Sequence, residues 1–196
     1  MGDSSVTMSS SRTWPEESLV RRCVEGERMA WRVLHRRYEP IARAFLRRLG
    51  VSPTELDDIC QEVFLRMFRA LPKFRGEAEL KTWLYRLCVT EARRARRYAS
   101  VAQALRRLLV MSPPERRSTG LELTGESAWK KLQLGLSTLK EAERAVFVMY
   151  ELEGVPGKQI AEVLSCPEAT VWRRLHYARR TFCAALEAQP VAGGRS

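Results

Sequence analysis

The chain has 196 residues, 45% of them hydrophobic, so it can bury a core, and its composition excludes disorder throughout. Its 34 lysines and arginines outnumber 23 aspartates and glutamates. The resulting net charge of +11 favours a polyanionic partner, which could be DNA, RNA or an anionic membrane surface. No stretch approaches the roughly 18 apolar residues of a membrane span, and the first residues lack the apolar core of a secretion signal. We therefore expect no membrane span and a cytoplasmic location.

Five cysteines are scattered along the chain without a Cys-x-x-Cys pair, and only two histidines accompany them. The odd number and the spacing disfavour both a disulfide framework and a zinc cluster. No His/Asp/Glu metal cluster and no pairing of a nucleophile with a base is found in the sequence. We therefore expect no metal, no cofactor and no enzymatic activity.

Residues 1–15 are expected to be a disordered tail. From Glu16 to Leu49, apolar residues recur at steps of three and four, which predicts an amphipathic helix that ends at Gly50. The next residues, SPTE at 52–55, combine a capping serine, a first-turn proline and the acid of a capping box. They predict a second helix that runs to Leu71 on a nearly unbroken apolar stripe.

This second helix carries acidic and amide side chains beside its apolar stripe. Asp57, Asp58, Gln61 and Glu62 form an edge that would repel phosphate, although the chain as a whole is basic. The edge is either a solvated helix face, which is the commoner case, or a docking surface for a basic partner protein.

A loop, PKFRGEAE, precedes a helix that begins near Leu80 and ends in the arginine-rich run RRARRY. Positive charge near the C-terminus of a helix is favoured by the helix dipole, so the run could be structural. Aromatic residues lie close by, however, and aromatic rings with arginines suit single-stranded nucleic acid. These rings belong to Phe74, Trp83, Tyr85 and Tyr98, of which Trp83 also has the spacing of a core residue.

The apolar pattern weakens over residues 99–127, where proline, serine and glycine predict a linker. Short helical patterns resume over residues 128–187, and residues 188–196 are expected to be a disordered tail. No segment alternates polar and apolar residues long enough to indicate a strand. The predicted fold is all-α, with two small helical domains, over 16–98 and 128–187, joined by a flexible linker.

The segment ATVWRRLHYARR in the second domain predicts a helix with two different faces. Val171, Leu175, Ala178 and Phe182 form an apolar stripe, and Ala169, Arg173, His176, Tyr177 and Arg180 lie opposite. A short helix and a tight turn come before it, which is typical of a helix-turn-helix that lays its second helix in the major groove. An ordinary surface helix with solvated arginines is the alternative.

Two stretches together resemble the defining regions of bacterial sigma factors, specifically the small extracytoplasmic-function (ECF) group. They are ELDDICQEVFLRMFRALPKFRGEAELKTWLYRL and LSTLKEAERAVFVMYELEGVPGKQIAEVLSCPEATVWRRLHYARRTF. The first is highly specific to that family, whereas the second alone suits many helix-turn-helix regulators. The resemblance covers most of residues 16–187 and implies a transcription initiation factor. A stand-alone helix-turn-helix regulator is the alternative hypothesis.

The resemblance also implies partners and roles for residues. Core RNA polymerase is the implied partner, through its clamp helices and its flap. Docking on the clamp helices falls to Asp57, Asp58, Gln61, Glu62, Phe64 and Leu65. Recognition of the unpaired minus-ten element of promoter DNA falls to Phe74, Arg75, Trp83, Arg86, Leu87, Thr90, Arg93, Arg94 and Arg97. Recognition of the minus-thirty-five element falls to Lys158, Arg173, Arg174, His176, Tyr177 and Arg180. An anti-sigma protein is a further candidate partner.

Four positions depart from the pattern of the family. Thr90 stands where the minus-ten pocket commonly has asparagine, and Trp172 stands where a basic residue is frequent. Ala169 replaces a common glycine, and Ser165 occupies the position of the usual turn glycine. The base preferences of the family therefore do not carry over to this chain.

Overall fold

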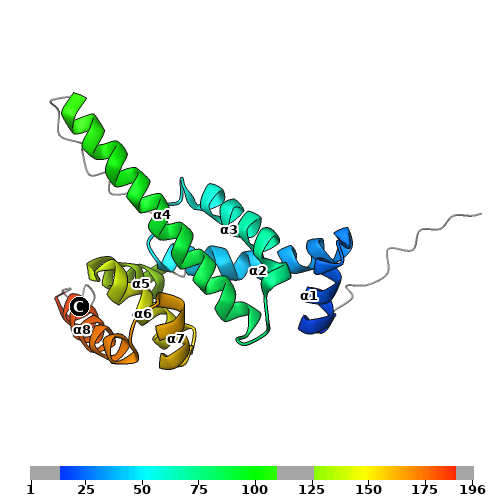
Figure 1. Ribbon diagram of the computed structural model, residues 1–196. Coiled ribbons are helices and arrows are strands. Elements are labelled where there is room, and N and C mark those ends of the chain that lie inside the picture. Colours follow the sequence, from blue (N-terminus) through cyan, green and yellow to red (C-terminus); the bar gives the residue numbers. More distant parts are fainter. Residues whose placement is uncertain (1–13, 110–125, 189–196) are drawn as a thin grey trace, which may run out of the picture.

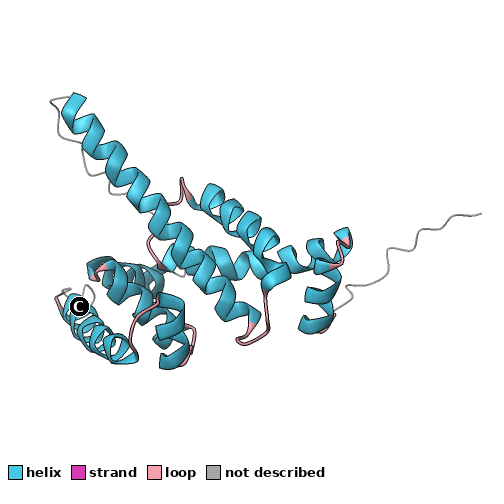
Figure 2. Ribbon diagram, viewed as in Figure 1, coloured by secondary structure: helices cyan, strands magenta, loops and turns pink. Residues whose placement is uncertain are grey.

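The computed structural model describes residues 14–109 and 126–188. Within these ranges there are eight α-helices and no strand, in agreement with the predicted all-α fold (Figure 2). Most of the two expected tails and residues 110–125 of the expected linker lie outside the described residues.

The first lobe consists of α1 (Glu16–Val24), α2 (Arg28–Arg48), α3 (Leu56–Ala70) and α4 (Leu80–Leu109) (Figure 1). Helix α3 packs against both α2 and α4, and α1 packs against α2. An ion pair between Arg66 of α3 and the buried Glu91 of α4 joins these two helices. The predicted apolar stripe of α3 faces the core, because Ile59, Cys60 and Met67 are all buried.

The predicted helix from Glu16 to Leu49 is in fact two helices. Gly26, with a φ of 83°, turns the chain between α1 and α2 in the left-handed region that glycine adopts at little cost. The indole of Trp31 donates a hydrogen bond to the carbonyl of Cys23 across the turn, at 2.9 Å. The break allows α1 to fold back against α2.

The start of α3 differs slightly from the predicted capping box. The hydroxyl of Ser52 donates to a carboxylate oxygen of Glu55 at 2.6 Å, so the two predicted side chains do pair. Residues 53–55 nevertheless form a turn, and the helix begins at Leu56. It ends at Ala70, and a short 3-10 turn, Leu71–Lys73, leads into the next loop.

The second lobe contains α5 (Glu126–Thr138), α6 (Glu141–Phe147), α7 (Gly157–Leu164) and α8 (Glu168–Glu187). Helix α6 continues into a π-helical turn, Val148–Leu152. Helix α8 packs against the other three helices, and its predicted stripe is the packed face. Val171, Leu175 and Ala178 are buried, and the ring of Phe182 stacks on Phe147 with 4.6 Å between centres.

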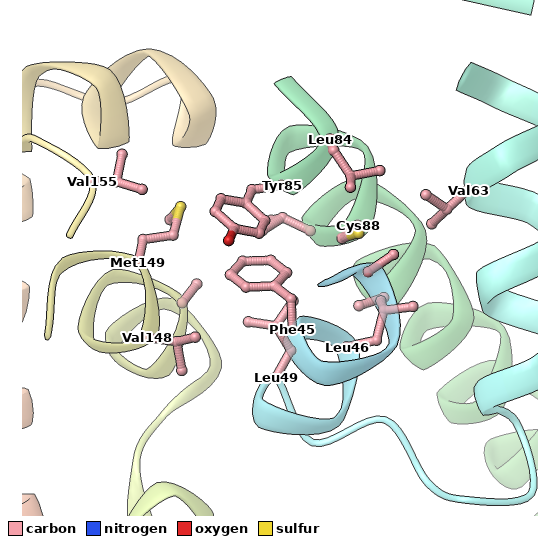
Figure 3. Close-up of a cluster of buried hydrophobic side chains, with 14 of the residues drawn as sticks. Phe45, Leu46, Leu49, Val63, Leu84, Tyr85, Cys88, Val148, Met149 and Val155 are labelled. Atoms are coloured by element: carbon pink, nitrogen blue, oxygen red, sulfur yellow. The ribbon is translucent and has the colours of Figure 1, made fainter. Parts of the chain in front are cut away.

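The two lobes share one apolar core. The rings of Phe45 from α2 and Tyr85 from α4 stack with 4.2 Å between their centres. Val148, Met149 and Val155 of the second lobe lie against this pair, as Figure 3 shows. All five side chains are buried, so contact between the lobes removes apolar surface from water.

Ser165 ends α7 with a φ of 51°, in the left-handed region that side chains other than glycine adopt at a cost. We expect Ser165→Gly to stabilise the fold by about 0.5–1 kcal/mol, because relief of this strain exceeds the entropy that glycine adds to the unfolded chain. Urea unfolding measures the difference. The control, Ser137→Gly in the last turns of α5, should instead destabilise by about 0.5–1 kcal/mol. A less stable Ser165→Gly protein would contradict the strain.

Candidate functional site

A groove of about 1560 Å³ runs between α1, α2 and α3. Aromatic rings line it: Trp31 lies 4.8 Å from Phe68 and His35 lies 4.4 Å from Phe64, between ring centres. Phe68 is 57% exposed, which is unusual for so large an apolar side chain and indicates a surface that contacts another molecule.

The six residues predicted to dock on a partner all belong to α3, but they face two sides of it. Asp57, Gln61, Phe64 and Leu65 line the groove. The remaining two acids, Asp58 and Glu62, line a smaller cavity of about 290 Å³ on the side of α4. Phe64 is buried, and the other five side chains are exposed.

Two acidic residues at the groove, Glu39 and Asp57, form its acidic rim and are both paired with one arginine. Arg43 of α2 pairs with both Asp57 and Glu39. These hydrogen bonds to Asp57 and then Glu39 raise the pKa of Arg43, so the guanidinium stays charged. Asp57 is therefore partly neutralised, whereas no ion pair is found for Asp58 or Glu62 among the described residues.

The loop after α3 brings its aromatic ring to the start of α4. Phe74 and Trp83 lie 5.2 Å apart between ring centres, and both are half-buried. Arg75 is exposed beside them. The pair forms an apolar edge that a base could stack against, and it also packs on the core as the spacing of Trp83 predicts.

Helix α4 presents most of the predicted minus-ten residues along one exposed face. Arg86, Thr90, Arg94 and Arg97 are exposed, and Leu87 is half-buried among them. Their spacing of three and four residues places them in line with Trp83. The hydroxyl of Thr90 donates to the carbonyl of Arg86 at 2.8 Å, so its oxygen keeps acceptor capacity toward a ligand.

Arg93 differs from these residues, because its side chain is half-buried. It points to the second lobe, where its Nε is 3.3 Å from a carboxylate oxygen of Glu141. Arg96, which was not among the predicted site residues, binds the other oxygen of Glu141 at 3.3 Å. The arginine run therefore divides between an exposed face and the contact between the lobes.

Helices α7 and α8 form the predicted helix-turn-helix. On α8, Arg173, His176, Tyr177 and Arg180 are exposed, and Lys158 is exposed near the start of α7. This agrees with the face expected from periodicity.

Arg174 differs from the other predicted residues of α8. It is half-buried, and its Nη1 donates to the sulfur of Cys166 at 3.6 Å. Arg174 therefore contacts the turn between α7 and α8, and its side chain is less accessible than those of the other predicted residues of α8.

Trp172 stands on the exposed side of α8, yet it is anchored to α7. A Cβ atom on Gly157 would lie 2.5 Å from the indole ring, so only glycine leaves room for this packing. The ring of Tyr150 meets the indole edge-on at 5.4 Å, and the indole nitrogen donates to Glu168 at 3.2 Å. The sequence identifies Trp172 as a departure from the pattern of the family. It does not reveal the packing of the indole against Gly157.

Two further findings concern metal binding and membrane spanning. No three His, Cys, Asp or Glu side chains in residues 14–109 and 126–188 gather closely enough to hold a metal ion. In the same ranges, no helix is both long and apolar enough to cross a membrane.

Two family models match the chain, Sigma-70 region 2 over residues 34–101 and Sigma-70, region 4 over residues 129–182. The ECF RNA polymerase sigma-E factor of Haemophilus influenzae is 30% identical over 177 residues, which cover 84% of this chain and 91% of that protein. The chain belongs to the ECF group of sigma-70 factors. The RNA polymerase sigma-H factor of Pseudomonas aeruginosa is 28% identical, over 88% of this chain and 94% of that one.

Solved structures of sigma factors share the fold. CnrH in complex with the cytosolic domain of CnrY matches with a TM-score of 0.63 at 23% identity, over 88% of this chain and 97% of that chain. The sigma factor RpoE from Bartonella quintana, in complex with the anti-sigma factor NepR, matches with a TM-score of 0.61 at 18% identity, over 80% and 96%. At these identities the likeness concerns the fold alone.

Membership of this family decides between the two functional hypotheses. A sigma factor is a transcription initiation factor that binds core RNA polymerase, recognises the minus-thirty-five and minus-ten promoter elements and promotes strand opening. The match to region 2 covers most of α2, all of α3 and α4 up to residue 101, which a stand-alone helix-turn-helix regulator would not require. The chain is therefore a sigma factor and not a stand-alone regulator.

Cys23 and Cys60 lie along the groove but are buried, and burial raises the pKa of each thiol to about 11. Because the thiolate is the reactive form, we expect an alkylating reagent at pH 8 to modify the exposed Cys183 and to leave Cys23 and Cys60 unmodified. Peptide mass spectrometry reads the result. The same reagent in guanidinium should modify all of them, and modification of Cys60 in the folded chain would contradict its burial.

The same thiols predict a pH dependence of stability. Between the ordinary thiol pKa of 9.0 and about 11, the folded chain keeps protons that the unfolded chain releases. The free energy of unfolding should therefore fall as the pH rises through this window. Urea unfolding at several pH values measures the slope, which Cys60→Ala should reduce.

Proposed function

We propose that three separate surfaces of this sigma factor carry its three tasks. Residues 16–98 act as the domain that docks on polymerase and reads the minus-ten element. Residues 128–187 act as the domain that reads the minus-thirty-five element, and residues 99–127 link the two. The observation that supports this division most is the exposed acidic and amide stripe on α3, whose charge is opposite to that of the exposed arginines of α4 and α8.

The stripe on α3 suits a cationic partner helix. Asp58 and Glu62 are four residues apart, as are Gln61 and Leu65, and all four side chains are exposed. Leu65 and the aromatic groove supply apolar contact, and the acids supply complementary charge. Such a surface, apolar at its centre with charges at the rim, is typical of a specific protein interface. We propose that this surface binds the clamp helices of core RNA polymerase. Asp57 and Phe64, which line the groove, belong to the same binding surface.

The exposed face of α4 suits an unpaired strand. Arg86, Arg94 and Arg97 would follow the phosphates, while the edge made by Phe74 and Trp83 would stack on an extruded base. Extraction of a base costs roughly a few kcal/mol, and stacking offsets it at about 1–3 kcal/mol per base. Strand opening then follows from binding the unpaired form, so the chain itself needs to make or break no covalent bond.

The exposed face of α8 suits the major groove of the minus-thirty-five element. Arg173 is the residue best placed to bind guanine O6 and N7 together, since it is exposed near the N-terminal end of the helix. His176 and Tyr177, whose rings lie 5.7 Å apart, would meet base edges or phosphates beside it. Arg180 and Lys158 would contact the backbone.

Two further proposals concern the setting. An anti-sigma protein is a proposed partner, because two similar structures are complexes, one of them with a named anti-sigma factor. We also propose that the chain acts in the cytoplasm, where core polymerase and promoter DNA are found.

Arg173→Ala should reduce promoter-specific transcription, because one bidentate contact to guanine contributes about 1–3 kcal/mol of discrimination. Run-off transcription with purified core polymerase measures the loss, and co-purification should show that polymerase binding is unchanged. Arg179→Ala is the matched control, because Arg179 is engaged with Glu151 and Tyr150 of its own lobe. Equal effects of the two variants would argue against base reading by Arg173.

Charge reversal of Asp58 and Glu62 to arginine should weaken association with core polymerase at least tenfold, because the stripe on α3 would then repel a cationic partner. Fluorescence anisotropy with labelled chain and core polymerase measures the affinity. Reversal of Glu17 and Glu187, which are exposed on other helices, changes the net charge equally and serves as the control. Unchanged affinity in the first variant would remove the assignment of the stripe on α3.

A further inference from the structure

The loop between α3 and α4 is held at both of its ends by α1. It comprises residues 74–79 and carries the ring of Phe74, one half of the edge to which we assign base stacking. Helix α1 packs against the 3-10 turn Leu71–Lys73, where the loop begins (Figure 1). It also reaches Leu80, where the loop ends, through the side chain of Glu16. A helix from the start of the chain therefore fixes both ends of the loop.

Glu16 caps the N-terminus of α4. The first backbone N–H of that helix, from Leu80, donates to Oε1 of Glu16 at 3.3 Å. The first N–H groups of a helix have no partner within the helix, and the helix dipole favours a negative charge beside them. The first turn of α4 contains no acid of its own, and Lys81 places a positive charge in it. Glu16 supplies the negative charge from 64 positions away in the sequence.

The second carboxylate oxygen of Glu16 is bound by α2. The hydroxyl of Tyr38 donates to Oε2, and burial followed by this hydrogen bond raises the pKa of Tyr38, so the phenol keeps its proton. Tyr38 is itself buried, so the donor is fixed in place. Because its two oxygens are divided between α2 and α4, the carboxylate cannot rotate away from Leu80 without also losing its bond to Tyr38.

The backbone that carries Glu16 is also fixed. Arg37 of α2 donates from Nη2 to the backbone carbonyl of Trp14 at 2.9 Å. The guanidinium of Arg22 lies over the indole of Trp14, 4.9 Å from the ring centre. On the other side of Glu16, Leu19 is fully buried. The start of α1 is thus anchored before and after Glu16.

At the other end of the loop, the turn against which α1 packs sets the position of Phe74. Leu71, the first residue of that turn, is buried, and its carbonyl accepts a hydrogen bond from the N–H of Phe74 at 3.0 Å. The middle of the loop is open, because a Cβ atom on Gly76 would meet no other atom within 4 Å. The position of the loop therefore depends on its two ends.

Phe74 and Trp83 stand at these two ends, with 5.2 Å between their ring centres. Helix α1 therefore controls the geometry of the edge that the two rings form. Packing of the core alone would be served by Leu19 and Cys23, the buried side chains of α1. The hydrogen bonds of Glu16 add a directional constraint, which fixes the start of α4 more closely than apolar contact does.

We propose that Glu16 is a positioning residue for recognition of the minus-ten element. It holds the loop and the first turn of α4 in the arrangement that receives an extruded base, so that less ordering remains to occur on binding. The proposal rests on the proposed role of Phe74 and Trp83 in base stacking. Glu16 acts through Leu80 and Tyr38 and does not itself contact DNA.

The first test measures base discrimination by the reconstituted holoenzyme. Core polymerase with the wild-type chain or a variant selects from a pool of single-stranded oligonucleotides with a randomised central stretch, and sequencing gives the enrichment of each base over core polymerase alone. Contacts to phosphates carry no sequence information, whereas an ordered edge can prefer one base. Glu16→Ala should lower the enrichment of the preferred base about threefold, because ordering a free side chain on binding weakens affinity by this order.

A purely structural role would give a different result, since a loss of folded protein lowers the amount of DNA bound without changing the enrichment. Glu17→Ala is the matched control, because Glu17 is the neighbouring residue, has the same charge and is exposed. It should keep the wild-type enrichment. Equal enrichment in Glu16→Ala and Glu17→Ala would overturn the proposal.

Glu16→Gln tests the hydrogen bonds themselves. The glutamine oxygen can still accept from Leu80, and the amide group can donate to the oxygen of Tyr38. This variant should therefore keep most of the wild-type enrichment. A loss as large as that of Glu16→Ala would overturn the assigned role of these bonds.

Hydrogen exchange of the free chain tests the fixed loop without DNA. Glu16→Ala should speed exchange in a peptide that covers residues 74–83 about fivefold, the factor that corresponds to the loss of one helix cap. Peptides from α8 should be unchanged, and Glu17→Ala should leave both regions unchanged. Exchange at the wild-type rate over residues 74–83 in Glu16→Ala would contradict the cap.

Circular dichroism confirms that each variant is folded. If Glu16→Ala does not fold, Tyr38→Phe takes its place, because it removes one anchor of the carboxylate and keeps the buried ring. It should lower enrichment and speed exchange in the same regions, and wild-type values of both would overturn the proposal.

Failure of the proposal can be told apart from failure of the function on which it rests. If the wild-type holoenzyme enriches no base beyond core polymerase alone, the assigned role of Phe74 and Trp83 is wrong, and the proposal falls with it. If the wild-type holoenzyme enriches a base and Glu16→Ala does so equally, only the positioning role of Glu16 is wrong.

Discussion

The stacked rings of Phe45 and Tyr85 are the contact on which the arrangement of the whole molecule depends (Figure 3). They belong to the core of the first lobe, and the side chains that cover them belong to the second lobe. The first lobe therefore completes its core with residues of the second. The hydroxyl of Tyr85 reaches Glu153, so the apolar contact and the buried carboxylate reinforce each other.

Helix α4 serves both lobes because successive faces of one long helix point in different directions. One face is buried against α2 and α3 through residues such as Leu84 and Cys88. A second face, with Thr90 and Arg94, is exposed, and a third holds the second lobe through Arg93 and Arg96. A single helix thus links core packing, the assigned nucleic-acid surface and the contact between lobes.

The features that the sequence predicts correctly are local ones. The apolar stripes of α3 and α8 predict which faces are buried, since helical periodicity depends only on residues three and four apart. The turn at Gly26 is missed, because an isolated glycine with no proline beside it is a weak break signal. The pairing of Glu141 with Arg93 joins residues 48 positions apart, and no pattern of spacing or composition indicates such a contact.

The sequence also does not predict the direction in which exposed side chains point. Motifs identify Asp57, Asp58, Gln61 and Glu62 as a group, but only the neighbouring helices determine that Asp57 faces the groove and Asp58 faces α4. Likewise, the pattern of α8 marks Arg174 as polar without revealing that it turns toward Cys166. Side-chain direction in these cases depends on which helix packs alongside.

The fit of Trp172 against Gly157 has a consequence for how this protein can change over evolutionary time. A Cβ atom at position 157 would meet the indole at 2.5 Å, so either the ring must move or α7 must shift relative to α8. The two positions should therefore vary as a pair among descendants of this chain: a bulkier residue on α7 becomes tolerable only after the tryptophan has given way to something smaller. Although Trp172 lies at the surface, the substitutions it tolerates therefore depend on the residue at position 157.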